Sequence, residues 1–100
     1  MNIEENIARS SELRGQSHKV GVAFLKTELD TALTFVQSAL QAGDDRNRRA
    51  RNLANARKGY DTFLYLRGRW WSDIDLSERE EMEIKLKSVQ SALMELGEKL

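Results

Sequence analysis

The sequence contains no cysteine and no proline. Without cysteine there is no disulfide, no thiolate nucleophile and no cysteine-ligated zinc site. Because proline blocks helix interiors, its absence permits long uninterrupted helices. Long apolar runs are also missing, since no stretch approaches the roughly 20 apolar residues with which a helix crosses a bilayer. We therefore expect a helical protein that is cytoplasmic and makes no use of a membrane.

Residues that carry catalysis or bind metal ions are scarce. The one histidine, His18, has no cysteine, second histidine or carboxylate beside it at helical spacing. Asp73 and Asp75 form an Asp-x-Asp pair, but a calcium loop also needs a glycine and a glutamate where this sequence has Glu78 and Ile84. The glycines occur singly, so there is no phosphate-binding loop. We expect no enzyme activity, no cofactor, no metal site and no small-molecule substrate.

Three segments have apolar residues at steps of three or four, which is the spacing of one helix face. They are residues 17–42, 45–71 and 77–98. In the last, the apolar residues repeat every seven positions, as in a helix that packs nearly parallel to its neighbour; they are Met82, Leu86, Val89, Leu93 and Leu96, and Leu100 continues the repeat beyond the segment. Gly43 followed by Asp44 and Asp45 marks a helix end and a new start. Ser77 and Glu80 have the spacing of a capping box.

Three helices joined by short links predict an all-α, antiparallel three-helix bundle. Residues 17–100 form this bundle domain. Residues 1–16 are polar, and we expect them to form an N-terminal arm or a short fourth helix.

Several large apolar side chains exceed what a three-helix core needs. Phe24 and Phe35 lie to one side of the main apolar stripe of their helix. Trp70 and Trp71 are adjacent, so only one of them can face the core; we expect Trp71 to close the core and Trp70 to cover the helix end or contact a partner. The phenylalanines either pack on another helix of the chain or form a dimer surface. Together with Ile84 and Met94, this surplus predicts a homodimer.

Charge is unevenly distributed along a chain whose net charge is zero. Residues 44–71 carry eight basic and three acidic side chains, whereas residues 72–100 carry four basic and eight acidic ones. One interpretation is that the basic middle helix pairs with the acidic last helix. The other is that the basic helix binds an acidic protein or a phosphate backbone. The candidate partner-binding residues are Arg48, Arg51, Lys58, Tyr65, Arg69, Trp70, Phe24 and Phe35.

The segment from Leu29 to Leu66, with Ala56, Tyr60 and Phe63 in its second half, resembles a tetratricopeptide helix pair. The order of three helices is also similar to that of a microtubule-interacting-and-trafficking domain. The Trp-x-x-Leu-Gly-x-x-Tyr opening and the closing proline of a tetratricopeptide repeat are absent. This resemblance implies a helical module that binds peptides. We therefore expect a non-enzymatic interaction or structural module, and as the alternative a nucleic-acid-associated protein that uses the arginine-rich helix 46–69.

Overall fold

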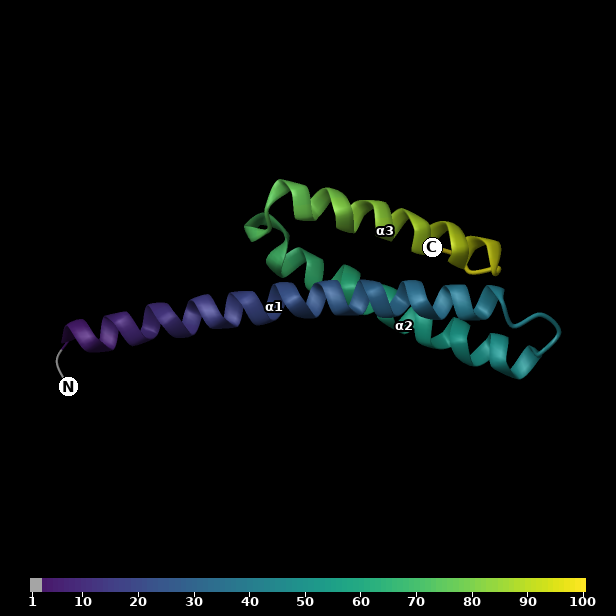
Figure 1. Ribbon diagram of the computed structural model, residues 1–100, viewed down its shortest axis with the longest axis horizontal. Coiled ribbons are helices and arrows are strands. Elements are labelled where there is room, and N and C mark those ends of the chain that lie inside the picture. The colour runs from purple at the N-terminus through teal and green to yellow at the C-terminus, as the bar shows by residue number, and fades with distance from the viewer. Residues whose placement is uncertain (1–2) are drawn as a thin grey trace.

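The computed structural model describes the backbone of residues 3–100 and the side chains of residues 19–100. It contains three α-helices, α1 (Ile3–Leu40), α2 (Arg46–Trp70) and α3 (Leu76–Glu95), and a short 3-10 helix, η1 (Trp71–Asp73), between α2 and α3 (Figure 1). The described residues form no strand. The prediction of an all-α antiparallel three-helix bundle is therefore confirmed.

The first helix is longer than predicted. We expected a helix over residues 17–42 and a separate arm or short helix over residues 1–16, but α1 runs without a break from Ile3. Once a helix has formed, each added residue contributes a hydrogen bond, and a single glycine costs only about 1 kcal/mol, so Gly15 does not end it. The side chains of the predicted arm lie outside the described residues, and so does that of His18.

The turn between α1 and α2 follows the chemistry that its sequence predicts. Gly43 has a φ of 59°, a left-handed conformation that glycine adopts without steric cost. Asp45 is the N-cap of α2, and its carboxylate accepts a hydrogen bond of 3.0 Å from the backbone N–H of Arg48. The turn reverses the chain, so α1 and α2 pack antiparallel.

The two helices approach each other closely at Gly59. A Cβ atom at this position would lie 3.3 Å from the Cβ of Ala32 and 3.3 Å from the carbonyl oxygen of Glu28. A side chain there would push the helices apart. Gly59 is itself buried, and it therefore sets how closely α2 packs on α1.

The core lies where α1 contacts both other helices. Its fully buried large side chains come from all three helices; they are Leu25, Leu29, Val36, Phe63, Val89 and Leu93. The seven-residue repeat of α3 is confirmed from Met82 to Leu96. The five apolar residues of the repeat in this range are each 8% exposed or less. Leu100 was predicted to continue it but is 52% exposed, because α3 ends at Glu95.

Both ends of α3 differ from their predicted positions. The helix begins at Leu76 with Asp75 as its N-cap, so the predicted capping box of Ser77 and Glu80 is wrong. The buried side chain of Ile74 anchors the connection in the core, and the helix follows directly from it. At the other end, Gly97 has a φ of 95° and the N–H of Glu98 bonds to the carbonyl of Leu93 at 2.9 Å. This is a Schellman motif, which stops the helix before residue 98.

The three helices do not contact one another equally. α1 packs extensively on α2, and α3 packs mainly on α1. Among the described residues, the surface of α1 and α2 around Phe24 and Leu66 forms an open hollow to which α3 contributes no residue. None of the described helices is long and apolar enough to span a bilayer.

Candidate interaction surface

A hollow on the surface joins α1 to the end of α2. It has a volume of about 260 Å³ and is lined by Val20, Gly21, Phe24, Leu66, Arg69 and Trp70. Val20 is 67% exposed and Phe24 is 50% exposed, whereas Leu66 and Trp70 are partly buried. Large aromatic and aliphatic groups thus line an open site that partner side chains can enter.

The indole of Trp70 forms one wall of the hollow because α1 has no side chain at position 21. A Cβ atom on Gly21 would lie 2.5 Å from Cε2 of Trp70, so the ring packs directly on the α1 backbone. The guanidinium of Arg69 lies 5.1 Å from the centre of the Trp70 ring, within the range of a cation–π interaction. Sequence reasoning missed Gly21 and Leu66. A lone glycine inside a helix often has a packing reason, and that signal was present for Gly21.

Beyond the hollow, α1 and α2 stay in close contact at Gly59, which lies beside Ala32 and Glu28. On α1, residues at steps of three or four lead away from the hollow along one face; they are Val20, Phe24, Thr27, Thr31 and Phe35. On α2, the corresponding face carries Asn55, Gly59, Thr62, Leu66 and Arg69. We call these ten residues, together with Gly21 and Trp70, the α1–α2 face. Arg69, at one end of it, is the only charged residue among them, and Glu28 on α1 borders the face beside Gly59.

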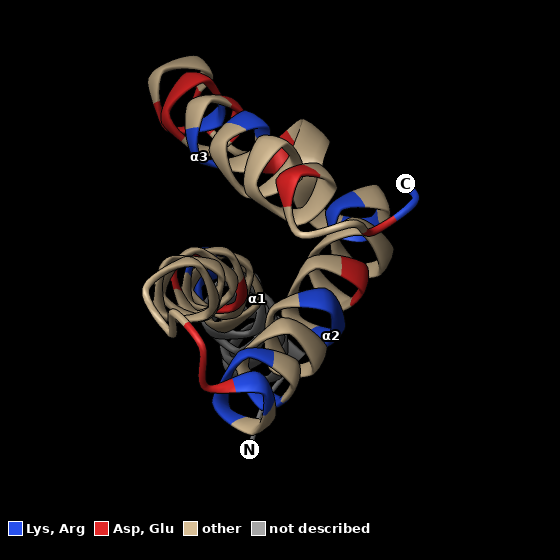
Figure 2. Cartoon of the chain, turned by 90° about the vertical axis from the view of Figure 1, so that its right-hand side faces the viewer, with Lys and Arg blue, Asp and Glu red and all other residues tan. Residues whose placement is uncertain are grey.

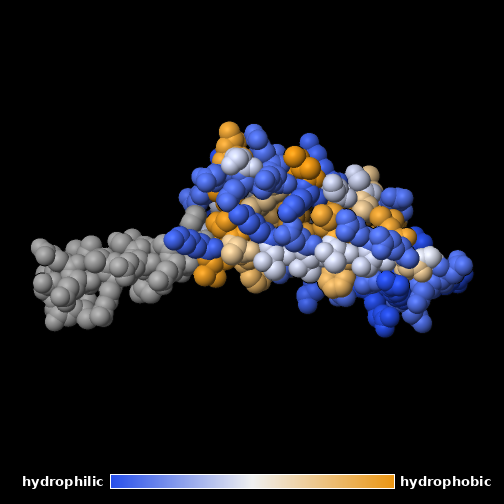
Figure 3. Space-filling view, in the orientation of Figure 1, coloured by the Kyte–Doolittle hydropathy of each residue, from blue (hydrophilic) through white to orange (hydrophobic). Residues whose placement is uncertain are grey.

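Most residues of this face are uncharged, in contrast to much of the rest of the surface. Figure 3 shows blue, hydrophilic residues over much of the molecule, with hydrophobic and weakly polar residues along α1. In the whole chain, charged residues make up 32%. The centres of protein interfaces are depleted of charged residues and enriched in aromatic ones, and the α1–α2 face shares both properties.

The structure places the predicted aromatic residues in different environments. Phe24 is half exposed and lies in the hollow with Trp70. Phe35 is partly buried and packs against the core, and Trp71 does the same. Trp70 also packs against the core, as expected for a side chain that covers the helix end. Ile84 and Met94, 68% and 62% exposed, lie on α3 and do not contribute to this face.

The predicted basic residues lie on the outer side of α2. Arg48, Arg51, Lys58 and Arg69 are exposed, and Tyr65 between them is 84% exposed. Figure 2 shows these basic segments of α2 in blue. Within residues 19–100, no ion pair of 4.0 Å or less involves Arg48, Arg51 or Lys58. These cations therefore border the α1–α2 face and are accessible to an anion.

The expected pairing between basic α2 and acidic α3 is found at one residue only in the described part of the chain. Arg57 approaches Glu98 at 3.9 Å and donates a hydrogen bond to the carbonyl of Lys99. The other inter-helix ion pairs join α3 to α1, because α3 packs mainly on α1. They are Lys26 with Glu78 at 2.8 Å and Lys85 with Asp30 at 2.7 Å, and the hydrogen bond to Asp30 raises the pKa of Lys85.

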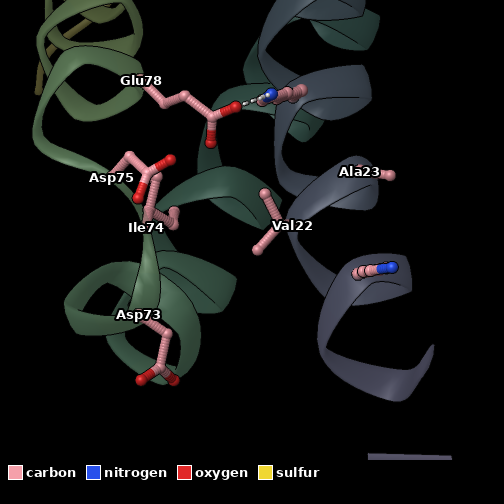
Figure 4. A pocket seen from close by; sticks show the side chains of 8 residues that line it. Val22, Ala23, Asp73, Ile74, Asp75 and Glu78 are labelled. Carbon is pink, nitrogen blue, oxygen red and sulfur yellow. Dashed lines mark hydrogen bonds and ion pairs between the residues drawn. The ribbon is translucent and has the colours of Figure 1, made fainter. Parts of the chain in front are cut away.

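A second hollow, of about 440 Å³, lies between α1 and the connection from α2 to α3 (Figure 4). The ion pair of Lys26 and Glu78 crosses it, and the carboxylates of Asp73 and Asp75 point in different directions. Nowhere in the described part of the chain do three carboxylate, histidine or cysteine side chains come together as metal ligands. Asp75 occupies the N-cap position of α3, but its side chain makes no capping hydrogen bond there.

Comparisons of this chain with models of protein families, with curated proteins and with solved structures found no match. The resemblance to tetratricopeptide and microtubule-interacting-and-trafficking modules therefore stays a prediction. What is known of the candidate site comes from its own residues.

Proposed function

We propose that this chain is a non-enzymatic interaction module that binds a protein partner through the α1–α2 face. The observation that carries the proposal is the hollow in which Phe24, Leu66 and Trp70 lie together at the surface. Aromatic and arginine side chains in such positions provide much of the binding energy in protein interfaces. This function agrees with the peptide binding that the tetratricopeptide resemblance implies.

A comparison of two single variants tests this function. Phe24→Ser removes a half-exposed aromatic ring from the hollow, and Ile84→Ser removes an exposed apolar side chain from α3. The tagged chain and both variants are used to capture proteins from a lysate of cells that express it, and the captured proteins are quantified by mass spectrometry. We expect a protein that the parent chain and Ile84→Ser retain and Phe24→Ser loses. Equal capture by all three chains would contradict the proposal.

Nucleic acid is the second candidate partner, because the cations of α2 are exposed and several have no ion-pair partner in the described region. Arg51 and Lys58 are seven residues apart on one side of the helix, a spacing at which both can contact one phosphate backbone. Binding to random-sequence duplex DNA over a series of salt concentrations tests it. An affinity for DNA that falls steeply as the salt concentration rises would support this alternative. The variant Arg51→Glu should then bind DNA more weakly than the parent chain at the same salt concentration. The absence of measurable binding at low salt would exclude it.

The homodimer predicted from the sequence is an alternative to this partner binding and is tested by light scattering. Phe24 and Trp70 lie on one face, as a dimer surface requires, but Phe35 belongs in part to the core. A monomer mass at about 100 µM, well above the dissociation constants of specific dimers, would contradict self-association. The cytoplasmic location expected from the sequence is tested by cell fractionation.

A further inference from the structure

We propose that the α1–α2 face binds an acidic amphipathic helix of the partner, which lies in the groove between α1 and α2 with its carboxylates along α2. This inference rests on the proposed function and adds the chemistry of the partner. It is carried by the shape of the groove and by the sign of the charges along one of its sides.

The shape of the groove fits a helix. α1 and α2 run antiparallel and in close contact, and α3 forms ion pairs with Lys26 and Asp30, which lie on a different side of α1 from Phe24. A fourth helix in this groove completes a four-helix arrangement, a common way to bury two apolar helix faces. From Phe24 to Phe35 the face extends 11 residues, which is about 16 Å or three helical turns. Apolar residues of a partner helix at spacings of three, four and seven can reach along this length.

The charges along the groove are of one sign on the α2 side. Arg51 and Lys58 are exposed and two turns apart, and Arg69 continues the line beside Trp70. On the α1 side the exposed neighbours are threonines, Thr27 and Thr31, and the partly buried Glu28 is the one charged residue that lies beside Gly59. A partner helix alongside α2 therefore meets cations on one flank only. Glutamates seven residues apart on that flank match the spacing of Arg51 and Lys58, as in paired helices with charged flanking positions.

This arrangement of charge and apolar surface favours an acidic helix over the other occupants. A phosphate backbone would use the cations but leave Phe24 and Leu66 without a contact. A second copy of the same face would bring the cations of both α2 helices into one interface, where like charges repel. An acidic amphipathic helix uses both the apolar hollow and the cations.

Designed peptides test the inference directly. The probe is a helical peptide of about 18 residues, five turns, with leucines along one face and glutamates along one flank. The first matched peptide has lysine in place of each glutamate, and the second has serine in place of each leucine. Binding to the 100-residue chain is measured by titration calorimetry at two salt concentrations.

The protein variants separate the apolar contribution from the charged one. We expect the acidic peptide to bind and both matched peptides to bind at least tenfold more weakly, as loss of a central contact requires. Phe24→Ser lowers the affinity for the acidic peptide about tenfold. The double variant Arg51→Glu, Lys58→Glu also lowers the affinity for the acidic peptide about tenfold, and it raises the affinity for the lysine peptide. Ile84→Ser and Lys87→Glu, exposed positions on α3, leave the affinity unchanged.

Each contrary outcome has a distinct meaning. If no peptide binds, the inference is overturned. If the lysine peptide binds as well as the acidic one and Phe24→Ser weakens both, the charge argument is overturned while the proposed function stands. If Phe24→Ser has no effect on any peptide, both fail. Sedimentation of the protein alone shows whether the chain forms a dimer. If it does and the peptide dissociates that dimer, the face binds a second copy of the chain and the inference is overturned.

Discussion

The ring of Trp70 lies against the backbone of Gly21, so close that a Cβ atom at position 21 would come within 2.5 Å of Cε2 of the indole. Two residues 49 positions apart in the sequence thereby join the end of α2 to α1 and form the wall of the hollow that contains Phe24. The glycine has no other evident function in the helix, where it lowers helix propensity. We infer that this contact fixes the position of Trp70.

Gly21→Ala is therefore expected to destabilise the chain by about 1–3 kcal/mol, because the added methyl group must displace the indole. Gly68→Ala is the matched control: a Cβ atom at position 68 has no atom within 4 Å, and that substitution should stabilise α2 by up to about 1 kcal/mol. Urea denaturation measures both. Tryptophan fluorescence should shift in Gly21→Ala and stay constant in Gly68→Ala. A Gly21→Ala variant as stable as the parent would show that Trp70 moves away at no cost.

Leu93→Ala should destabilise the chain by about 2–5 kcal/mol, because Leu93 is fully buried at the centre of the α3 seam. Ile84→Ala, on the same helix but 68% exposed, should change stability by less than about 0.5 kcal/mol. Denaturant melts of the two variants compare buried and exposed faces of one helix. Equal losses would mean that α3 packs through a different face.

The hydrogen bond that Gln90 donates to the hydroxyl of Tyr60, at 3.1 Å, is a direct link between α2 and α3. Tyr60 is only 5% exposed, so its hydroxyl has little access to water. A double-mutant cycle of Tyr60→Phe and Gln90→Ala should give a coupling energy of about 0.5–1.5 kcal/mol. Additive effects of the two substitutions on the free energy of unfolding would show that the bond contributes nothing.

The carboxylates beside the second hollow should not bind a divalent cation tightly. Asp73 and Asp75 point apart, and Glu78 is paired with Lys26. We expect thermal melts of the chain to be unchanged by micromolar calcium, magnesium or zinc, because binding to the folded state would raise the melting temperature. A rise that Asp75→Asn abolishes would instead identify a cation site at the start of α3.

The helices themselves follow from the sequence. Periodic apolar residues, the absence of proline, Gly43 and Asp45 suffice to predict three helices and the turn between the first two, because these signals act within a few residues of each other. The buried seam of α3 was predicted from Met82 to Leu96 for the same reason. Of the predicted surface residues, Arg51, Lys58 and Tyr65 were placed on an exposed side correctly, since their positions relative to the apolar stripe depend on helical geometry alone.

Only the tertiary structure decided which surfaces meet. α3 forms ion pairs mainly with α1 rather than with basic α2. Packing decides this, because exposed ion pairs contribute too little free energy to determine which helices lie side by side. The same holds for the contact of Gly21 with Trp70 and for the separation of Phe24 in the hollow from Phe35 against the core. Local sequence determines that a helix forms and which side of it is apolar. The fit between side chains far apart in the chain determines which apolar residues become core and which remain at the surface for a partner.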